Sequence, residues 1–222
     1  MKMALSDEEK YLIENILENK SLDHLGKCLF FFIHQPNLIE WILKHEVDLE
    51  PEINDHTHHT PLGYACWLKQ PSENINMSIE LLLAKGADPN ARSISGKTPF
   101  DYSVRNKNEK ISQLLLQSNG FDISECHEEG RHAMAKAACW GLYEIVGELL
   151  AKRVDPNRAF WDCESALTLA VTHNQYETLE LLVNNGADVN LKNDQGETAL
   201  SWATYLEKDG FVEKLKEAGA TE

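Results

Sequence analysis

Hydrophobic residues recur at helical spacing in short segments of this chain, and polar loops separate these segments. The leucines within 78–84 and 176–183 follow the helical period. Several segments begin with Thr or Ser followed by Pro or Ala, a typical helix start because the hydroxyl caps free backbone N–H groups. Gly86 and Gly186 follow apolar stretches, where a left-handed C-cap is expected. The pattern predicts units of helix, tight turn and helix, joined by extended loops.

The helix-start strings repeat along the chain. They are TPLGYA at 60–65, TPFDYS at 98–103, HAMAKA at 132–137, SALTLA at 165–170 and TALSWA at 198–203, with starts 38, 34, 33 and 33 residues apart. A second landmark keeps the same register, since an aspartate stands 10 residues before each later start, at Asp88, Asp122, Asp155 and Asp188. Two landmarks in one register indicate internal repeats.

In these strings the sequence resembles the ankyrin repeat family, whose unit of about 33 residues carries a T-P-L-H-x-A signature. The resemblance covers 25–222, as about six units that start near residues 25, 60, 98, 132, 165 and 198. It implies an all-α ankyrin-repeat solenoid of stacked helix-turn-helix units with extended finger loops. Residues 6–19 form a further amphipathic segment, which we expect to cap the stack. The predicted domains are therefore a capping helix region at 1–24 and an ankyrin repeat domain at 25–222.

The chain departs from the repeat pattern in two places. The spacing of 38 residues leaves extra residues, which we place at 69–76 as a longer turn, because Pro71 prevents a continuous helix there. A glycine stands two positions before three of the repeat starts, whereas His58 and Cys163 occupy that position in two others. We expect the loops at His58 and Cys163 to differ in shape.

The resemblance implies a non-catalytic protein-binding module whose ligands lie against the finger loops and first helices. Binding hot spots are rich in Trp, Tyr and Arg. The predicted partner-binding residues are Trp67, Arg105, Trp140, Phe160, Trp161, His173 and Tyr205. An alternative for Trp67 and Trp140 is that they fill gaps between neighbouring first helices.

Composition and charge narrow the class of partner. The 222 residues carry 21 Lys and Arg against 36 Asp and Glu, a net charge of −15, which argues against nucleic-acid binding. No apolar run approaches the ~20 residues of a membrane helix. The five scattered cysteines make no disulfide framework, and Asp7, Glu8 and Glu9 interrupt any signal-peptide core. We expect a monomeric cytoplasmic protein that binds another protein.

Acidic residues crowd the fingers of the C-terminal half, and they are Glu128, Glu129, Asp162, Glu164, Asp194 and Glu197. Such a surface would steer a basic segment of a partner toward it. The alternative is that these are ordinary solvated loop carboxylates.

Candidate chemistry is sparse. The histidines of 56–59 suit a metal such as zinc, but the next such cluster, at Cys126, His127 and His132, lies two repeats away. Cys66 and Cys139 fall in predicted first helices, where a small thiol packs and no orienting third group is assignable. We expect no metal, no cofactor and no enzymatic activity.

Two further hypotheses come from resemblance alone. Small ankyrin proteins of intracellular bacteria act as effectors or adaptors that are secreted into the host cytosol, which is the alternative function. Asn90, Asn157 and Asn190 resemble the finger asparagines that an asparaginyl hydroxylase of animal cells modifies, although Asn also suits this turn on its own.

Overall fold

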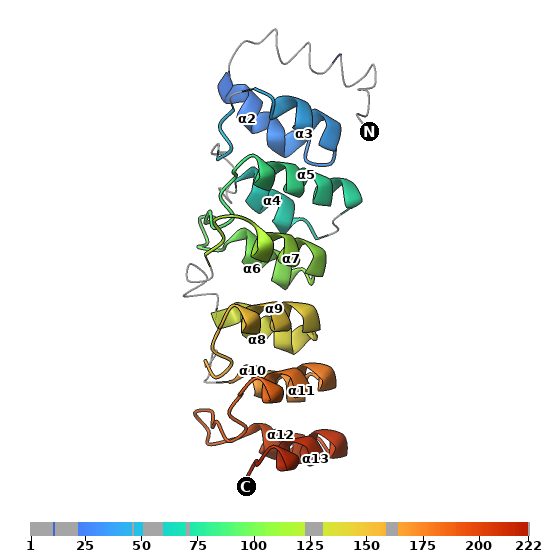
Figure 1. Ribbon diagram of the computed structural model, residues 1–222, viewed down its shortest axis with the longest axis vertical. Helices are drawn as coiled ribbons and strands as arrows, with labels where there is room; N and C mark the ends of the chain where they lie inside the picture. Colours follow the sequence, from blue (N-terminus) through green and yellow to red (C-terminus); the bar gives the residue numbers. More distant parts are fainter. Residues whose placement is uncertain are drawn as a thin grey trace. The chain divides into compact units, whose positions relative to one another are not determined.

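The computed structural model describes residue 11 and residues 22–45, 47–50, 60–69, 72–122, 131–158 and 164–221, with only the backbone of 22–25, 131 and 132. Over these residues the chain is all-α, with twelve helices and no strand (Figure 1). It divides into two compact units, Met1–Phe121 and Asp122–Glu222. The all-α prediction is confirmed. The expected capping helix at 6–19 lies outside the described residues, apart from Tyr11.

The helices alternate between a first and a second helix of each repeat. The first helices are α2 (Leu22–Phe31), α4 (Pro61–Trp67), α6 (Pro99–Arg105), α8 (Arg131–Trp140), α10 (Ala166–Thr172) and α12 (Ala199–Tyr205). The second helices are α3 (Pro36–Ile42), α5 (Glu73–Ala84), α7 (Glu109–Gln117), α9 (Tyr143–Ala151), α11 (Tyr176–Asn184) and α13 (Asp209–Glu217). Within each unit, consecutive first helices pack together and consecutive second helices pack together. This arrangement is a stack of helix pairs in two layers.

Hydroxyl caps fix the starts of four first helices. Thr60, Thr98, Ser165 and Thr198 each accept a hydrogen bond from the backbone N–H three residues on, at 3.1–3.2 Å. The Thr98 cap is reinforced because the Asp101 carboxylate accepts from the Thr98 N–H at 2.9 Å. The helix starts expected from the repeated strings are confirmed at these four positions.

Left-handed glycines end α5 and α11. Gly86 and Gly186 have φ of 92° and 85°, a region that glycine enters at no steric cost. The N–H of the residue after each glycine donates to the carbonyl five residues back, as in Ala87 to Leu82 at 3.0 Å. This is the Schellman arrangement, and it confirms the predicted C-caps.

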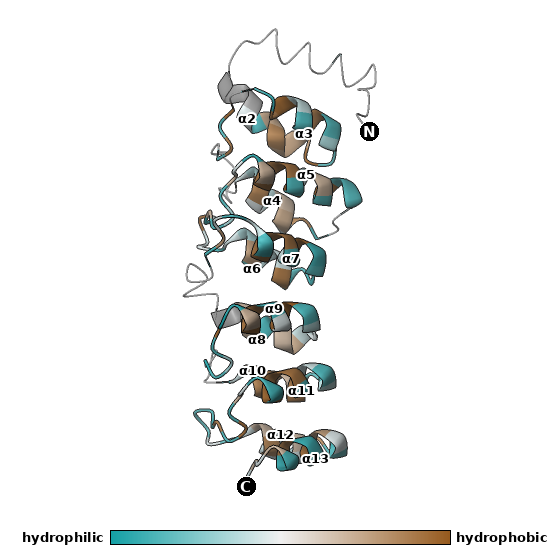
Figure 2. Ribbon diagram, in the orientation of Figure 1, coloured by the Kyte–Doolittle hydropathy of each residue, from teal (hydrophilic) through white to brown (hydrophobic). Residues whose placement is uncertain are grey.

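The apolar faces of the helices meet inside each unit. Phe100, Ile79 and Leu82 are fully buried in the first unit, and Leu179 and Leu182 are fully buried in the second. Figure 2 shows hydrophobic and hydrophilic residues on the same helices, whereas the loop between α11 and α12 is mainly hydrophilic. Each helix pair therefore buries one side against its neighbours, which is how repeat stacks build a core.

The extra residues of the second repeat are shared between its turn and α5. The turn between Trp67 and Glu73 contains Pro71, as expected from the sequence. However, α5 has twelve residues, where α7, α9, α11 and α13 each have nine. The prediction that all of 69–76 lengthens the turn is therefore wrong for residues 73–76, which are helical. Ser72 begins this longer helix, since its hydroxyl accepts from the Ile75 N–H at 3.4 Å.

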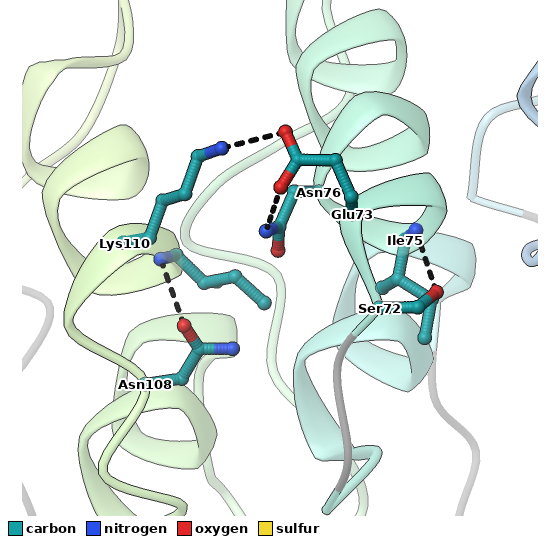
Figure 3. A network of polar contacts seen from close by, with 7 residues as sticks. Ser72, Glu73, Ile75, Asn76, Asn108 and Lys110 are labelled. Atoms are coloured by element: carbon teal, nitrogen blue, oxygen red, sulfur yellow. Dashed lines mark hydrogen bonds and ion pairs between the residues drawn. The ribbon is translucent and has the colours of Figure 1, made fainter.

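Ion pairs link consecutive second helices. In Figure 3 the Lys110 Nζ of α7 lies 2.8 Å from Oε1 of Glu73 at the start of α5, and Asn76 donates to the other oxygen of Glu73. The hydrogen bond from Lys110 lowers the pKa of Glu73. In the second unit, Lys214 of α13 pairs with Glu180 of α11 at 2.9 Å. The exposed Glu73–Lys110 pair contributes little stability, whereas the Glu180–Lys214 pair is partly buried.

Asparagines join each finger loop to the loop of the next repeat. The side-chain amides of Asn90, Asn157 and Asn190 donate to the carbonyls of Gly120, Gly186 and Gly219, at 2.7, 3.3 and 3.2 Å. The oxygen of Asn157 accepts from the Asp188 N–H at 2.6 Å, and that of Asn190 accepts from the Thr221 N–H at 2.8 Å. Asn157 and Asn190 thus use both the nitrogen and the oxygen of the side-chain amide to contact the next loop.

Over the described residues, no helix has the length and apolarity that a membrane crossing requires.

Candidate protein-binding surface

Most of the residues that end the first helices are large. They are Phe31, Trp67, Arg105, Trp140, Thr172 and Tyr205. The exposed fraction is 78 % for Phe31, 42 % for Trp67 and 77 % for Tyr205, and Arg105 is also exposed. Large apolar side chains at this exposure lie where another molecule can cover them. In each unit, we call these residues, with the described parts of the adjoining finger loops, the first-helix surface.

In the first unit, the exposed Trp67 at the end of α4 contacts one of a series of aromatic side chains. Trp67 stacks on Tyr64 with ring centroids 5.9 Å apart and planes 26° apart. Tyr64 in turn lies 5.8 Å from the ring of Phe30 on α2. These contacts fix one face of the Trp67 indole and leave the rest accessible. Trp67 therefore packs against a ring of its own helix and remains exposed, and its role in partner binding stays a prediction.

Phe31 was missed in the sequence analysis. The repeat starting near residue 25 carries no recognisable start string, so the end of its first helix could not be located from the repeat pattern. The available signal was the aromatic run at Phe30, Phe31 and Phe32. In α2 the first of these is buried and the second is exposed, because successive residues of a helix point in different directions.

A residue from the next repeat holds the end of α4. The Asn106 amide donates to the carbonyls of Cys66 and Trp67, at 3.1 and 3.0 Å. The final carbonyls of a helix lack partners inside the helix, so this side chain completes its hydrogen bonding. Asn106 thereby positions the backbone that carries the Trp67 side chain, beside the exposed Arg105.

The finger loop before α6 is pinned by Tyr102. The Tyr102 hydroxyl lies 3.0 Å from Ser93 Oγ and 3.2 Å from Ser95 Oγ. The loop closes through the Ser93 N–H, which donates to the Lys97 carbonyl at 3.0 Å. At its tip the Ile94 side chain is 70 % exposed. The loop therefore presents an apolar side chain from a fixed frame.

In the second unit, Tyr205 stands at the end of α12 with its ring edge-on to Trp202, at 5.9 Å and 87°. The exposed His173 caps the end of α10, where its Nδ1 lies 3.1 Å from both the Leu169 carbonyl and Thr172 Oγ1. Trp140 is half-buried at the end of α8. The predicted residues of this unit thus fall at corresponding helix ends.

The ends of α8 and α10 are also held by the following repeat. The Lys208 ammonium donates to the carbonyls of Val171 and Thr172, at 2.6 and 3.3 Å, and burial lowers the pKa of Lys208. The Gln175 amide donates to the Cys139 carbonyl at 3.5 Å. A side-chain donor from the following repeat therefore binds carbonyls at the end of each of these first helices. It is an amide in Asn106 and Gln175 and an ammonium in Lys208.

The acidic finger residues divide into different environments. Asp194 is exposed at a finger tip, and Glu164 is half-buried. The carboxylate of Glu197 accepts from the Asn193 amide at 2.9 Å, so this side chain helps to close its own loop. Arg105 and the half-buried Lys97 give the corresponding surface of the first unit a positive charge.

Several predicted residues lie outside the described residues. These are Phe160, Trp161, His56, His58, His59, Cys126, His127, Glu128, Glu129, Asp162 and Cys163, with the side chain of His132. Over the described residues, no three His, Cys, Asp or Glu side chains come together as metal ligands. Cys28 and Cys66 are free thiols, and burial raises the pKa of Cys66. A protonated, buried thiol is a poor nucleophile.

Comparison with protein families agrees with this geometry. A family model described as ankyrin repeats in three copies matches residues 72–160 and 157–221. The chain is 28 % identical over 184 residues to the mitochondrial disaggregase of Bos taurus, covering 73 % of this chain and 25 % of that protein. It is 25 % identical over 222 residues to the transient receptor potential cation channel subfamily A member 1 of Homo sapiens, covering 93 % and 19 %. The chain thus spans a quarter or less of the length of these two relatives.

Solved structures share the arrangement of helices. A crystal structure of an ankyrin repeat domain from Acinetobacter baumannii is 26 % identical, with a TM-score of 0.75 and coverage of 87 % of this chain and 98 % of that one. The ankyrin repeat domain of Bcl-3, a member of the IkappaB protein family, is 24 % identical, with a TM-score of 0.70 and coverage of 87 % and 86 %. The latter likeness concerns the fold.

Proposed function

Because the chain belongs to the ankyrin repeat family, we propose that it is a non-catalytic module that binds a partner protein through the first-helix surface. The observation that carries this proposal is the exposure of Phe31, Trp67 and Tyr205 at the ends of first helices. Exposed aromatic residues on a rigid frame lose little conformational freedom on binding. Ankyrin repeat domains are typically protein-binding modules and generally non-catalytic.

The frame around these anchors supports this function. Asn106 and Lys208 hold the helix ends next to the aromatic residues, and Tyr102 holds a finger loop. Such contacts set the positions of the side chains before a partner arrives. The repeated surface of each unit can therefore act as a preformed docking site, with Trp67 and Arg105 in the first unit and His173 and Tyr205 in the second. We retain Trp140, Phe160 and Trp161 as proposed binding residues of the second unit.

For the second unit we propose a partner segment that carries basic residues. Asp194 and Glu164 lie in its finger loops, and their charge would attract Lys or Arg side chains. An association rate that falls as salt rises, measured for the wild type and lost in Asp194→Asn, supports this choice of partner. An unchanged salt dependence would contradict it.

The proposal also covers the domain organisation of the chain and its cellular compartment. We propose that 25–222 is one ankyrin repeat domain preceded by a capping region at 1–24, and that the protein acts as a monomer. The free thiols of Cys28 and Cys66 fit a reducing compartment such as the cytoplasm.

The experiment that tests the function is affinity capture with immobilised wild-type protein and single variants, followed by mass spectrometry. Trp67→Ala and Tyr205→Ala remove one anchor in each unit. Tyr143→Ala is the matched control, because Tyr143 is 45 % exposed but belongs to the second helix α9. Proteins retained by the wild type and by Tyr143→Ala, yet lost with either anchor variant, are the partners that the proposal requires. Retention of the same proteins by all four baits would refute it.

A further inference from the structure

The first loop of the described chain has a glutamate where three of the later loops have asparagine. The N–H of Glu50 donates to Asp48 Oδ1 at 2.9 Å, and the N–H groups of Asn90, Asn157 and Asn190 donate to Asp88, Asp155 and Asp188 at the same distance. The Asp88 N–H donates to Glu50 Oε1 at 3.0 Å, just as the Asp188 N–H donates to Asn157. Glu50 therefore occupies the position of the inter-repeat asparagines.

An ionised Glu50 cannot make the second hydrogen bond of the asparagine contact, in which the side chain donates to a glycine carbonyl. In the asparagine loops, the side-chain NH2 donates to the carbonyl of a glycine, as Asn157 does to Gly186. That glycine stands two residues before the residue whose N–H donates to the asparagine oxygen, which for Asn157 is Asp188. The equivalent of Gly186 is Gly86, which also has positive φ and stands two residues before Asp88. Among the described residues, the buried Oε2 of Glu50 has no hydrogen-bond partner. A carboxylate oxygen has no proton to donate, but a protonated carboxyl group does.

The surroundings of Glu50 favour the protonated form. Burial raises the pKa of Glu50 to about 7, and the charges of Asp88 and Asp48 raise it further, against the opposing effects of the Asp88 N–H and the Thr60 side chain. Asp88 belongs to the loop after α5, Asp48 to the loop after α3, and Thr60 to the start of α4. Two other polar groups of these elements, His45 and Lys85, line a hollow with Leu49 next to this loop.

We propose that Glu50 is a protonation-controlled link between the first two helix pairs of the first unit. In the protonated state Oε2–H donates to the Gly86 carbonyl and completes the contact that asparagine makes elsewhere. Ionisation removes this donor and places a buried charge beside Asp88. The pair α2 and α3 then opens more readily from the repeat that follows it. The asparagine links of the later repeats have no such dependence, because an amide does not titrate.

The direction of the pH effect follows from the raised pKa. The folded state binds the Glu50 proton more tightly than the unfolded state, whose glutamate titrates near the ordinary value of 4.5. The contribution of Glu50 to stability is therefore full below that value and is lost as pH rises through about 7. Above pH 7 the link is at its weakest.

The link is tested on the full-length protein by two measurements. The carboxyl carbon of Glu50, followed by NMR with labelled glutamate, should titrate far above the ordinary value of 4.5. Amide hydrogen exchange in 22–45, corrected for intrinsic rates, should show protection falling about tenfold between pH 5.5 and 8, after allowance for partial exposure. In Glu50→Gln this fall should disappear, because the amide donates at every pH. Glu40→Gln is the control and should behave as the wild type.

A Glu50 titration near 4.5, or an unchanged pH dependence of protection in Glu50→Gln, would overturn the proposal. Asn157→Glu provides a reciprocal variant that does not depend on the first unit. It should give residues 143–158 a pH-dependent protection that the wild type lacks. Absence of that new dependence in the folded variant would also count against the link.

Discussion

The side-chain amide of Asn106 lies 3.0 Å from the carbonyl oxygen of Trp67, so the third described repeat holds the end of the first helix of the second. The same amide also reaches the Cys66 carbonyl. This contact connects two properties of the molecule. It satisfies helix carbonyls that would otherwise lack partners, and it sets the direction of an exposed tryptophan.

Replacing Asn106 with Ala should lower the free energy of unfolding by about 1–2 kcal/mol, because two carbonyls lose their donor. Urea unfolding followed by circular dichroism measures this change. Asn119→Ala is the control, since Asn119 is exposed in the turn after α7 and should change stability by less than about 0.5 kcal/mol. Equal effects of the two substitutions would show that the Asn106 contact does not stabilise the stack.

Lys208→Met should destabilise the second unit by about 1 kcal/mol or more. The substitution keeps most of the aliphatic side chain but removes the ammonium, which donates to Val171 and Thr172 and lies 5.4 Å from the centroid of the Phe211 ring. Lys216→Met is the matched control, because Lys216 is exposed on α13. Thermal unfolding of both variants makes the comparison. A melting temperature for Lys208→Met no lower than that of Lys216→Met would contradict the assigned role.

Two glycines close together in the second unit should respond to alanine in opposite ways. Gly141 follows α8 with φ of 68°, and a Cβ there would collide with the side chain of Gln175. Gly141→Ala should therefore cost about 1–3 kcal/mol. Gly147 lies within α9, where the Cβ would make an ordinary contact with Leu181 at 3.8 Å.

Gly147→Ala should stabilise the protein by up to about 1 kcal/mol, because alanine favours a helix over glycine. Chemical unfolding of both variants in the same buffer shows whether each substitution raises or lowers the free energy of unfolding. Stabilisation by Gly141→Ala, or a loss with Gly147→Ala, would mean that the turn after α8 or the packing of α9 is not as described.

The features that the sequence predicted are those with local causes. Thr98 and Ser165 cap helices whose starts are marked by the next few residues, and Gly86 ends a helix by its own backbone preference. Such signals lie within one turn of the element that they define. They therefore fixed the class of fold and the positions of most helix ends.

The features that were not predicted depend on contacts across repeats. Asn106, Gln175 and Lys208 hold the previous first helix, but they differ in chemistry, and each lies 36 residues or more from its partner. Phe31 belongs to a repeat without its start string, so its position on the surface emerged only with α2. No pattern along a single repeat reports which side chain completes a hydrogen bond in its neighbour.

The central claim is that the first-helix surface binds a protein, and the most direct test is calorimetric titration of a captured partner against four proteins. Wild type and Tyr143→Ala should bind with equal affinity. At least one of Trp67→Ala and Tyr205→Ala should weaken binding by about 30-fold, the effect of losing an anchor worth about 2 kcal/mol, while remaining folded. Equal affinity of all four proteins, or a loss confined to Tyr143→Ala, would place the binding surface elsewhere.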